Sequence, residues 1–288
     1  MENNINILKR LDAKKHIHAA NYLAKYKNFN TLSKVQQDAF KKLLPEYIKF
    51  LNGNIKIKGH GEQEIKLRTK LLNNYFDFIS SNNYDNTFTS QGKFRSTIME
   101  EFMYMLFNDL IIEIKEKIKD DSNLLKIGRT KAYTNLYFAA KNLKNFIDEP
   151  KIEVNKKDQD FAIYRPIALS IGDRGSIQAN LPVLAVENKT YIDKTMLEGS
   201  IATAEKIKSG NPYSLFIIVT ETYEVDLSVD PAYSRIDQIY VLRKSKNSSE
   251  KKPIYSDVLF DLVSNVKNHL TRNWSDIEQK MNKLGKII

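Results

Sequence analysis

A carboxylate and an amine two positions apart end an apolar run of this chain. Glu187 and Lys189 follow residues 181–186, which are apolar at odd and even positions alike. That pattern predicts a strand covered on both faces. Because side chains alternate along a strand, Glu187 and Lys189 should share one face. Such a pair is either a solvated strand end or one half of a metal-dependent active site.

A second carboxylate emerges when the neighbouring apolar segments are paired. Residues 160–171 and 177–189 are strand-like, and the sequence GDRG at 172–175 is a turn signal between them. If these segments form an antiparallel hairpin centred on the middle of that turn, the numbers of facing residues sum to 347. Asp160 then faces Glu187, and directly opposed Cβ atoms lie about 4.5–5.5 Å apart.

Two facing carboxylates repel each other unless a cation offsets their charge. The chain has four scattered histidines and no cysteine, so a metal here would depend on carboxylate oxygens, which Mg²⁺ prefers. Asp160 and Glu187 would bind the ion. Lys189 would lie beside it, where an amine can hold a water or stabilise charge on a phosphate. A one-residue shift of the turn selects Asp158 on the same strand face; we prefer Asp160 because it adjoins the apolar run.

The elements that must position these residues change character near residue 150. Earlier segments read mainly as helices, with a kink or break at Pro45, and later ones include both strands and helices. We therefore predict an α/β fold, with a mixed β-sheet core flanked by helices and an N-terminal helical subdomain. The expected domains are a helical N-terminal region, 1–90, and an α/β domain with a C-terminal helix, 91–288. The expected helices are 32–51, 64–79, 94–118, 195–210 and 256–284, and the expected strands are 160–171, 177–189, 214–222 and 235–244.

The charge balance favours a polyanionic partner. Lysine and arginine number 45 against 35 aspartate and glutamate, giving a net charge of +10, an excess that favours nucleic acid. With 42% hydrophobic residues, the 288-residue chain can build a substantial core. No apolar stretch has the length of a signal-peptide core or a membrane span. We expect a soluble, cytoplasmic protein with no membrane partner.

Two segments carry a resemblance to a known superfamily. DQDFAI (158–163) and VLAVENKTYIDKTMLEGSIATAEKIK (183–208) resemble the PD-(D/E)xK nucleases, and among them the type II restriction endonucleases of the BbvCI type. No proline precedes Asp160, which departs from the motif. The resemblance implies a restriction-endonuclease-like fold and a Mg²⁺-dependent enzyme that hydrolyses phosphodiester bonds in double-stranded DNA. It assigns the catalytic set to Asp160, Glu187 and Lys189.

Members of this superfamily often place a further acid on the helix before the first strand, near the metal. Glu100 and Glu101 are the candidates here. We prefer Glu100 as a metal ligand because it lies one helical turn before Tyr104 and Phe107 and should face the sheet. Cutting both DNA strands requires two active sites, so we expect a homodimer or a heterodimer with a related subunit.

The candidate DNA contacts are basic or polar residues near the Glu-x-Lys pair and a set of arginines. Lys194 and Thr195 follow the pair closely, and arginine is the usual bidentate reader of guanine. The arginines considered are Arg165, Arg174, Arg235 and Arg243. Two other functions remain open from the sequence alone: a structure-specific repair or recombination nuclease, and a DNA-binding protein without catalytic activity.

Overall fold

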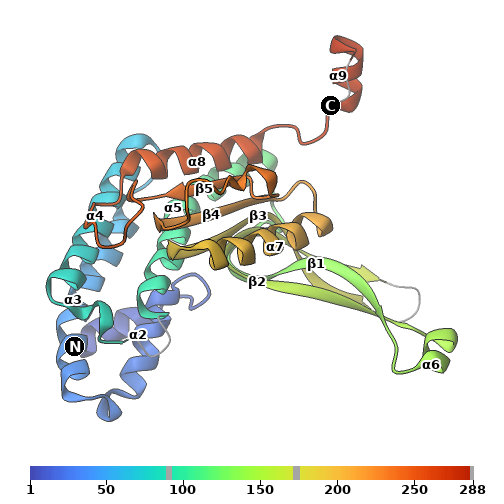
Figure 1. Cartoon of the computed structure of the whole chain (residues 1–288). Coiled ribbons are helices and arrows are strands. Elements are labelled where there is room, and N and C mark those ends of the chain that lie inside the picture. Colours follow the sequence, from blue (N-terminus) through green and yellow to red (C-terminus); the bar gives the residue numbers. More distant parts are fainter. Residues whose placement is uncertain (89–92, 171–175, 286–288) are drawn as a thin grey trace.

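A mixed sheet lies at the centre of the fold, with helices on both of its faces (Figure 1). The structure, a computed structural model, describes residues 1–88, 93–170 and 176–285. Its strands are β1 (Lys126–Ala139), β2 (Lys151–Ser170), β3 (Ser176–Ile192), β4 (Leu215–Tyr223) and β5 (Gln238–Val241). Its α-helices are α1 (Glu2–Lys9), α2 (Ile17–Lys27), α3 (Lys34–Lys56), α4 (Glu62–Ser81), α5 (Lys93–Ile118), α6 (Leu143–Asp148), α7 (Lys194–Gly210), α8 (Ser256–Thr271) and α9 (Ile277–Leu284). Short 3₁₀ helices are η1 (Phe29–Thr31), η2 (Tyr84–Asn86) and η3 (Pro231–Tyr233).

The strands follow the order β1–β2–β3–β4–β5 across the sheet. β1, β2 and β3 are antiparallel neighbours, and β4 and β5 continue parallel to β3. The predicted class, an α/β fold with a mixed sheet flanked by helices and a helical N-terminal region, is confirmed. β5 is shorter than the expected strand at 235–244, and β1 was not expected at all.

Strand β3 is buried on both faces, as its apolar pattern predicted. Leu184 and Val186 belong to the hydrophobic cluster that includes α5 and α8, whereas Ala185 belongs to the cluster that includes α7. Successive side chains therefore enter two different cores. Glu187 continues the series of Ala185 and so points toward α7.

The N-terminal helices extend the core that lies on the α5 side of the sheet. α2 and α4 contact α5, and their apolar side chains join the same cluster as the sheet residue Ile217. The division near residue 90 stays a prediction, since core residues from both sides of it share this cluster. Among the described helices, none is long and apolar enough to cross a membrane.

Two expected helices have different limits in the structure. α3 begins with a capping box between Ser33 and Gln36 and continues through Pro45 to its end, so the break is not found. Buried side chains on both sides of the proline hold that helix in place by tertiary packing. The expected C-terminal helix 256–284 is divided into α8 and α9. Trp274 lies between them, and its indole Nε1 donates to the carbonyl oxygen of His269, 2.7 Å away.

The register of the β2–β3 hairpin explains why the predicted pairing holds near the sheet centre. Phe161 faces Val186, and these numbers sum to the expected 347. Nearer the turn, Ser170 faces Ser176, which sums to 346. A bulge on β3 at Val183 accounts for the difference. The pairing sum beside the turn is therefore one lower than expected, and the bulge restores the predicted register at the carboxylates.

Strands β1 and β2 continue beyond the sheet as a two-stranded arm that ends in α6 (Figure 1). Where β1 lies in the sheet, Gly128 has a φ of +124°, and the β1–β2 register shifts between Gly128 and Thr130. A glycine suits this left-handed backbone, and the bulge leaves Arg129 outside the regular pairing.

Candidate active site

Two carboxylates and a lysine meet on the α7 side of the sheet. Asp160 of β2 and Glu187 of β3 each lie one residue beyond the facing pair Phe161 and Val186. The backbone N–H of Asn188 donates to Asp160 Oδ2 over 2.9 Å. The Nζ atom of Lys189 lies 3.4 Å from Glu187 Oε2. The structure thus brings together the three residues that the sequence selected.

Asp158, the alternative to Asp160, lies elsewhere. It is exposed and faces Lys131 of β1. Asp160 is partly buried, and the charges of Glu187 and Lys189 both act on it. The geometry therefore places Asp160, rather than Asp158, beside the Glu-x-Lys pair.

A serine on α7 holds the carboxylate of Glu187. Ser200 Oγ donates to Glu187 Oε2 over 2.7 Å, and both side chains are buried. Ser200 follows Leu197 at helical spacing on the buried face of α7, which packs on the sheet. We did not single out this serine from the sequence. The signal was available, because a polar residue in a buried helical stripe needs a partner.

Burial raises the pKa of the Asp160 carboxyl group. The Asn188 N–H and the Lys189 charge lower this pKa, Glu187 raises it, and the Arg129 charge lowers it, but desolvation is the largest influence. An acid with a raised pKa is one whose ionised form is destabilised by its surroundings. A bound cation would reverse that destabilisation.

The donor set fits a hard divalent cation. Asp160 and Glu187 present carboxylate oxygens from adjacent strands, and Mg²⁺ commonly uses one or two carboxylates together with waters and substrate phosphates. Within the described residues, no three His, Asp or Glu side chains form a metal-binding group on their own. The role of Glu100 as a further ligand therefore stays a prediction.

The two glutamates of α5 have different surroundings. Glu100 is buried, and Arg129 Nη1 of β1 lies 3.7 Å from its Oε2. Glu101 is fully buried and accepts the backbone N–H groups of His18 and Ala19 at the start of α2, over 2.9 and 3.0 Å. It also accepts the hydroxyl of Tyr47 over 2.6 Å. Glu101 therefore stabilises the N-terminal helices, whereas Glu100 lies beside an arginine whose charge also reaches Asp160.

A groove rich in cations includes Arg129, which lies beside Glu100 and whose charge acts on Asp160. Two adjoining hollows share Lys14, Arg129, Tyr164 and Asn180 among their lining residues. We call them together the basic groove. Its cations are Lys14, Lys15, Lys115, Lys126, Arg129, Lys131 and Lys156, and Asp12 is the acid among its lining residues. Neither Arg129 nor the lysines of this groove were selected from the sequence. Arg129, Lys126 and Lys131 lie on β1, which was not expected, and the other lysines come from segments far apart in the chain.

The described residues that were selected for DNA contacts do not line that groove. Lys194 and Thr195 are exposed at the start of α7, and Arg165 is exposed on β2. Arg174 lies outside the described residues. Arg235 pairs with Glu205 over 3.0 Å on the surface. The structure therefore leaves the DNA contacts of Lys194, Thr195 and Arg165 as predictions.

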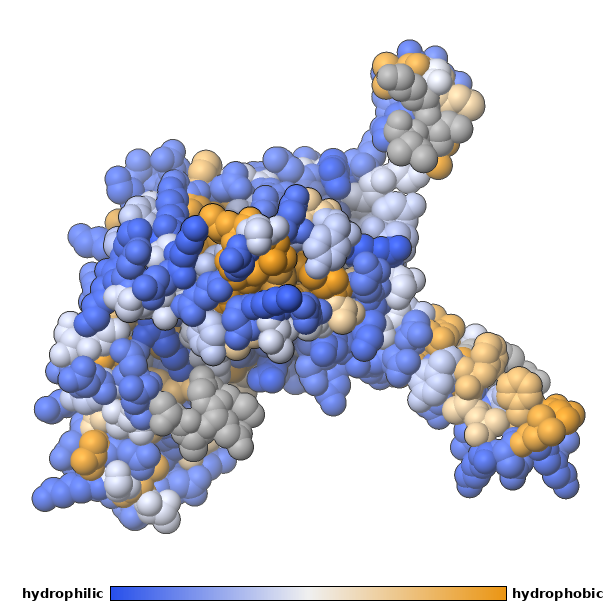
Figure 2. All heavy atoms as spheres, viewed as in Figure 1, coloured by the Kyte–Doolittle hydropathy of each residue, from blue (hydrophilic) through white to orange (hydrophobic). Residues whose placement is uncertain are grey.

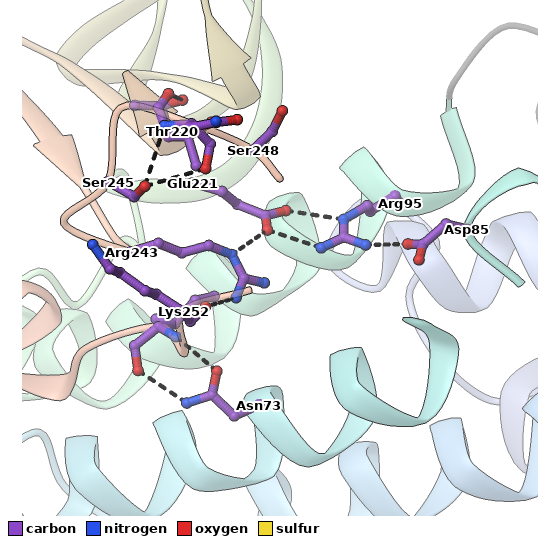
Figure 3. Close-up of polar contacts among 12 residues, drawn as sticks. Asn73, Asp85, Arg95, Thr220, Glu221, Arg243, Ser245, Ser248 and Lys252 are labelled. Atoms are coloured by element: carbon purple, nitrogen blue, oxygen red, sulfur yellow. Dashed lines mark hydrogen bonds and ion pairs between the residues drawn. The ribbon is translucent and has the colours of Figure 1, made fainter. Parts of the chain in front are cut away.

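Arg243 belongs to a buried ion network instead of an exposed surface (Figure 3). Its Nε donates to Glu221 Oε2 over 2.8 Å, and Arg95 of α5 holds both oxygens of Glu221 over 2.9 and 3.1 Å. Arg95 also contacts Asp85. Glu221 is 3% exposed, so its ion pairs with the two arginines offset the free-energy cost of removing its carboxylate from water. The network joins β4, α5 and the segment after β5.

Comparisons with known proteins identify a family and a similar fold. The family model described as Bpu10I restriction endonuclease matches residues 91–251, which include α5, the sheet and α7. The solved structure described as "native BbvCI A2B2 tetramer at low resolution" superposes with a TM-score of 0.67 and 21% sequence identity, covering 86% of this chain and 98% of that one. No curated protein sequence matches the chain significantly.

Proposed function

Since this chain belongs to the Bpu10I restriction endonuclease family, and is thus a type II site-specific deoxyribonuclease, we propose that it hydrolyses double-stranded DNA with Mg²⁺ at Asp160 and Glu187. The observation that carries this proposal is the meeting of Asp160, Glu187 and Lys189 on one sheet face. Arg129, whose charge acts on Asp160, also lines the basic groove. A pure DNA-binding surface does not require buried carboxylates that face a polyanion.

Each residue of the site has a separate task in this proposal. Asp160 and Glu187 hold the ion, and Glu100 is a further ligand candidate. The Asn188 N–H and the Ser200 hydroxyl fix the two carboxylates in position through their hydrogen bonds. When bound, Mg²⁺ stabilises the negative charge that develops on the phosphodiester. Hydrolysis leaves a 5′-phosphate, as the superfamily resemblance implies.

Lys189 acts on the attacking water or on the phosphate. Its ammonium group lies 3.4 Å from Glu187 and 31% of its side chain is exposed, so it can turn toward a bound substrate. A positively charged amine at this place stabilises the negative charge that develops on the phosphate oxygens in the transition state. Replacing it by alanine removes that stabilisation, while the hydrogen bonds from Asn188 and Ser200 still hold the two carboxylates.

The basic groove supplies the DNA-backbone contacts. Arg129 and Lys14 line both of its hollows, and Arg129 also lies beside Glu100. Contacts of lysine and arginine with phosphates bind the DNA backbone and carry no sequence information directly. Lys194, Thr195 and Arg165, which do not line the groove, remain proposed contacts, as does Arg174. We place this activity in the cytoplasm, where the DNA is accessible.

A multi-subunit enzyme suits this activity, because one centre cuts one strand at a time. The similar BbvCI structure is described as an A2B2 tetramer. We propose that this chain likewise acts in an assembly of at least two chains, either as a homodimer or with a related subunit.

Digestion of a sequenced plasmid tests the proposal. Purified protein with Mg²⁺ should give discrete fragments whose ends map to one short sequence, and EDTA should abolish cutting. Lys189→Ala should reduce the rate by at least about 100-fold, the usual scale for one group that stabilises transition-state charge. Equal rates for the two proteins would exclude the proposed role of Lys189. Cutting confined to branched DNA would instead identify a structure-specific nuclease.

A further inference from the structure

The arm formed by residues 133–156 packs against α7 only at its base, where Gly210 meets Tyr133 and Thr134. Here β1 and β2 pair with each other from Tyr133–Lys156 to Ala139–Lys151, and within the described residues no third strand continues the sheet alongside this part. Figure 1 shows the arm extending away from the helices, with α6 at its end. A two-stranded hairpin is marginally stable by itself in water, so a projecting arm of this length needs a partner surface.

One face of the arm's strands is apolar. Leu136 faces Val154 and Phe138 faces Ile152 across the two strands. Facing residues, and residues two positions apart on one strand, share a face of a ribbon, so these four side chains form one stripe. Leu136 is 45% exposed and Phe138 is 66% exposed.

The tip of the arm continues this apolar surface. Leu143, Phe146 and Ile147 of α6 stand at i, i+3 and i+4, which places them on one helical face. They are 73%, 57% and 72% exposed. Figure 2 shows orange and pale-orange atoms along the arm as far as this tip, unlike the mainly blue surroundings. We call the strand and helix residues together the arm stripe.

The arm stripe has the area of half an ordinary protein interface. With side chains of about 150–250 Å² each, the exposed fractions of these residues amount to roughly 600 Å² of apolar surface per chain. Apolar patches of that size mark interaction sites. Two such stripes together bury about 1,200 Å², the lower end of the range for stable complexes.

The charges of the arm identify the kind of partner. Residues 133–156 contain four lysines and three acidic residues, a net charge of +1 in a chain of net charge +10. A nearly neutral apolar arm does not suit DNA, whose backbone requires cations. It suits another arm of the same kind, because the two can approach with little like-charge repulsion. We propose that the arm stripe docks against the arm stripe of a second copy of this chain, in a two-fold symmetric contact.

This contact would also set the distance between two catalytic centres. β2 carries Asp160 only a few residues from the arm, and β1 carries Arg129 in the same way. A rigid pair of arms therefore fixes one site relative to the other, which is what a cut at defined positions in both strands requires. This consequence rests on the proposed function, whereas the association of the arms does not.

Analytical ultracentrifugation of the full chain, without DNA or metal, tests the contact. Wild-type protein should sediment as a dimer at about 10 μM. The double variant Phe138→Asp/Ile147→Asp should sediment as a monomer with an unchanged circular-dichroism spectrum. Leu67→Asp, which changes a 54% exposed leucine on α4, is the matched control and should remain dimeric.

Three results would overturn the inference. If the wild-type protein stays monomeric up to about 100 μM, the arms do not bind a second copy of this chain. That result would also be expected if a related subunit is the true partner. A dimer that survives the double variant uses another surface, and a Leu67→Asp variant that dissociates equally shows a non-specific effect. A catalytically inactive protein that dimerises through its arms would refute the proposed function and leave the arm contact intact.

Discussion

Replacing Asp160 by asparagine should stabilise the metal-free protein and remove its response to Mg²⁺. Burial raises the pKa of Asp160, so the ionised side chain destabilises the metal-free fold at neutral pH. An asparagine is nearly the same size and can still accept the Asn188 N–H through its oxygen. Removing the charge should raise stability by about 1 kcal/mol, a common size for one substitution. For a chain of this size that is about 2–4 °C in melting temperature.

Mg²⁺ should stabilise the wild type more than Asp160→Asn, although Asp160→Asn is the more stable protein without metal. In 10 mM Mg²⁺, a site with a dissociation constant of about 1 mM stabilises the wild type by about 1.4 kcal/mol, or roughly 3–6 °C. Asp160→Asn should gain much less, since it has lost one of two carboxylate ligands. Because the folded pKa of Asp160 is raised, the metal-free wild type is penalised above that pKa and not below it. The difference between the two metal-free proteins should therefore shrink as the pH falls.

Differential scanning fluorimetry in EDTA and in Mg²⁺, at pH 7.5 and at pH 4.5, measures all of these differences. The control is Asp158→Asn, which changes an exposed acid two residues away and should alter neither melting temperature nor metal response. A wild type that is more stable than Asp160→Asn in EDTA would refute the inference that burial dominates at this carboxyl group. An equal gain from Mg²⁺ in both proteins would refute the assignment of Asp160 as a ligand.

Three further outcomes are expected. Lys131→Gln/Lys156→Gln in the basic groove should weaken DNA binding, as measured by fluorescence anisotropy. The slope of log K against log salt should become less steep by about 1.8, at about 0.9 for each of the two lost phosphate contacts. The control Lys34→Gln/Lys42→Gln on α3 should leave that slope unchanged. Glu221→Gln should lower the free energy of unfolding by about 3–5 kcal/mol in urea titrations, because Arg95 and Arg243 lose their buried partner. The control Asp257→Asn removes an exposed partner of Lys244 and should lower it by less than about 1 kcal/mol. Burial lowers the pKa of His18 to about 3, so protonation favours the unfolded state, and wild-type stability should fall by roughly 2.5 kcal/mol from pH 7 to pH 4.5; a His18→Gln variant with the same slope would refute this origin.

The sequence predicted the parts of the site whose signals are local. The apolar run before Glu187 specified a doubly covered strand, and the helix from Lys194 to Gly210 was expected almost at its observed limits. The pairing of Asp160 with Glu187 needed only a hairpin. Its success depended in part on the bulge at Val183, which compensated for the shifted pairing beside the turn.

The parts that could not be predicted depend on contacts between distant segments. Arg129 reaches Glu100 because a bulge beside Gly128 directs it toward α5, and no local pattern in β1 specifies that direction. Ser200 supports Glu187 only once α7 has packed on the sheet. Arg243 could be considered for DNA until the fold showed Glu221 buried against it.

The rate of a single turnover on DNA that carries the recognition sequence tests the central claim most directly. The claim is that the hairpin register places Asp160, and not Asp158, opposite Glu187 to form the nuclease centre. With enzyme in excess and Mg²⁺ present, Asp160→Asn and Glu187→Gln should each cut at least about 100-fold more slowly than wild type, while Asp158→Asn cuts at the wild-type rate. DNA affinity measured in Ca²⁺ should be retained by all three variants. Loss of cutting in Asp158→Asn with normal cutting in Asp160→Asn would contradict the account.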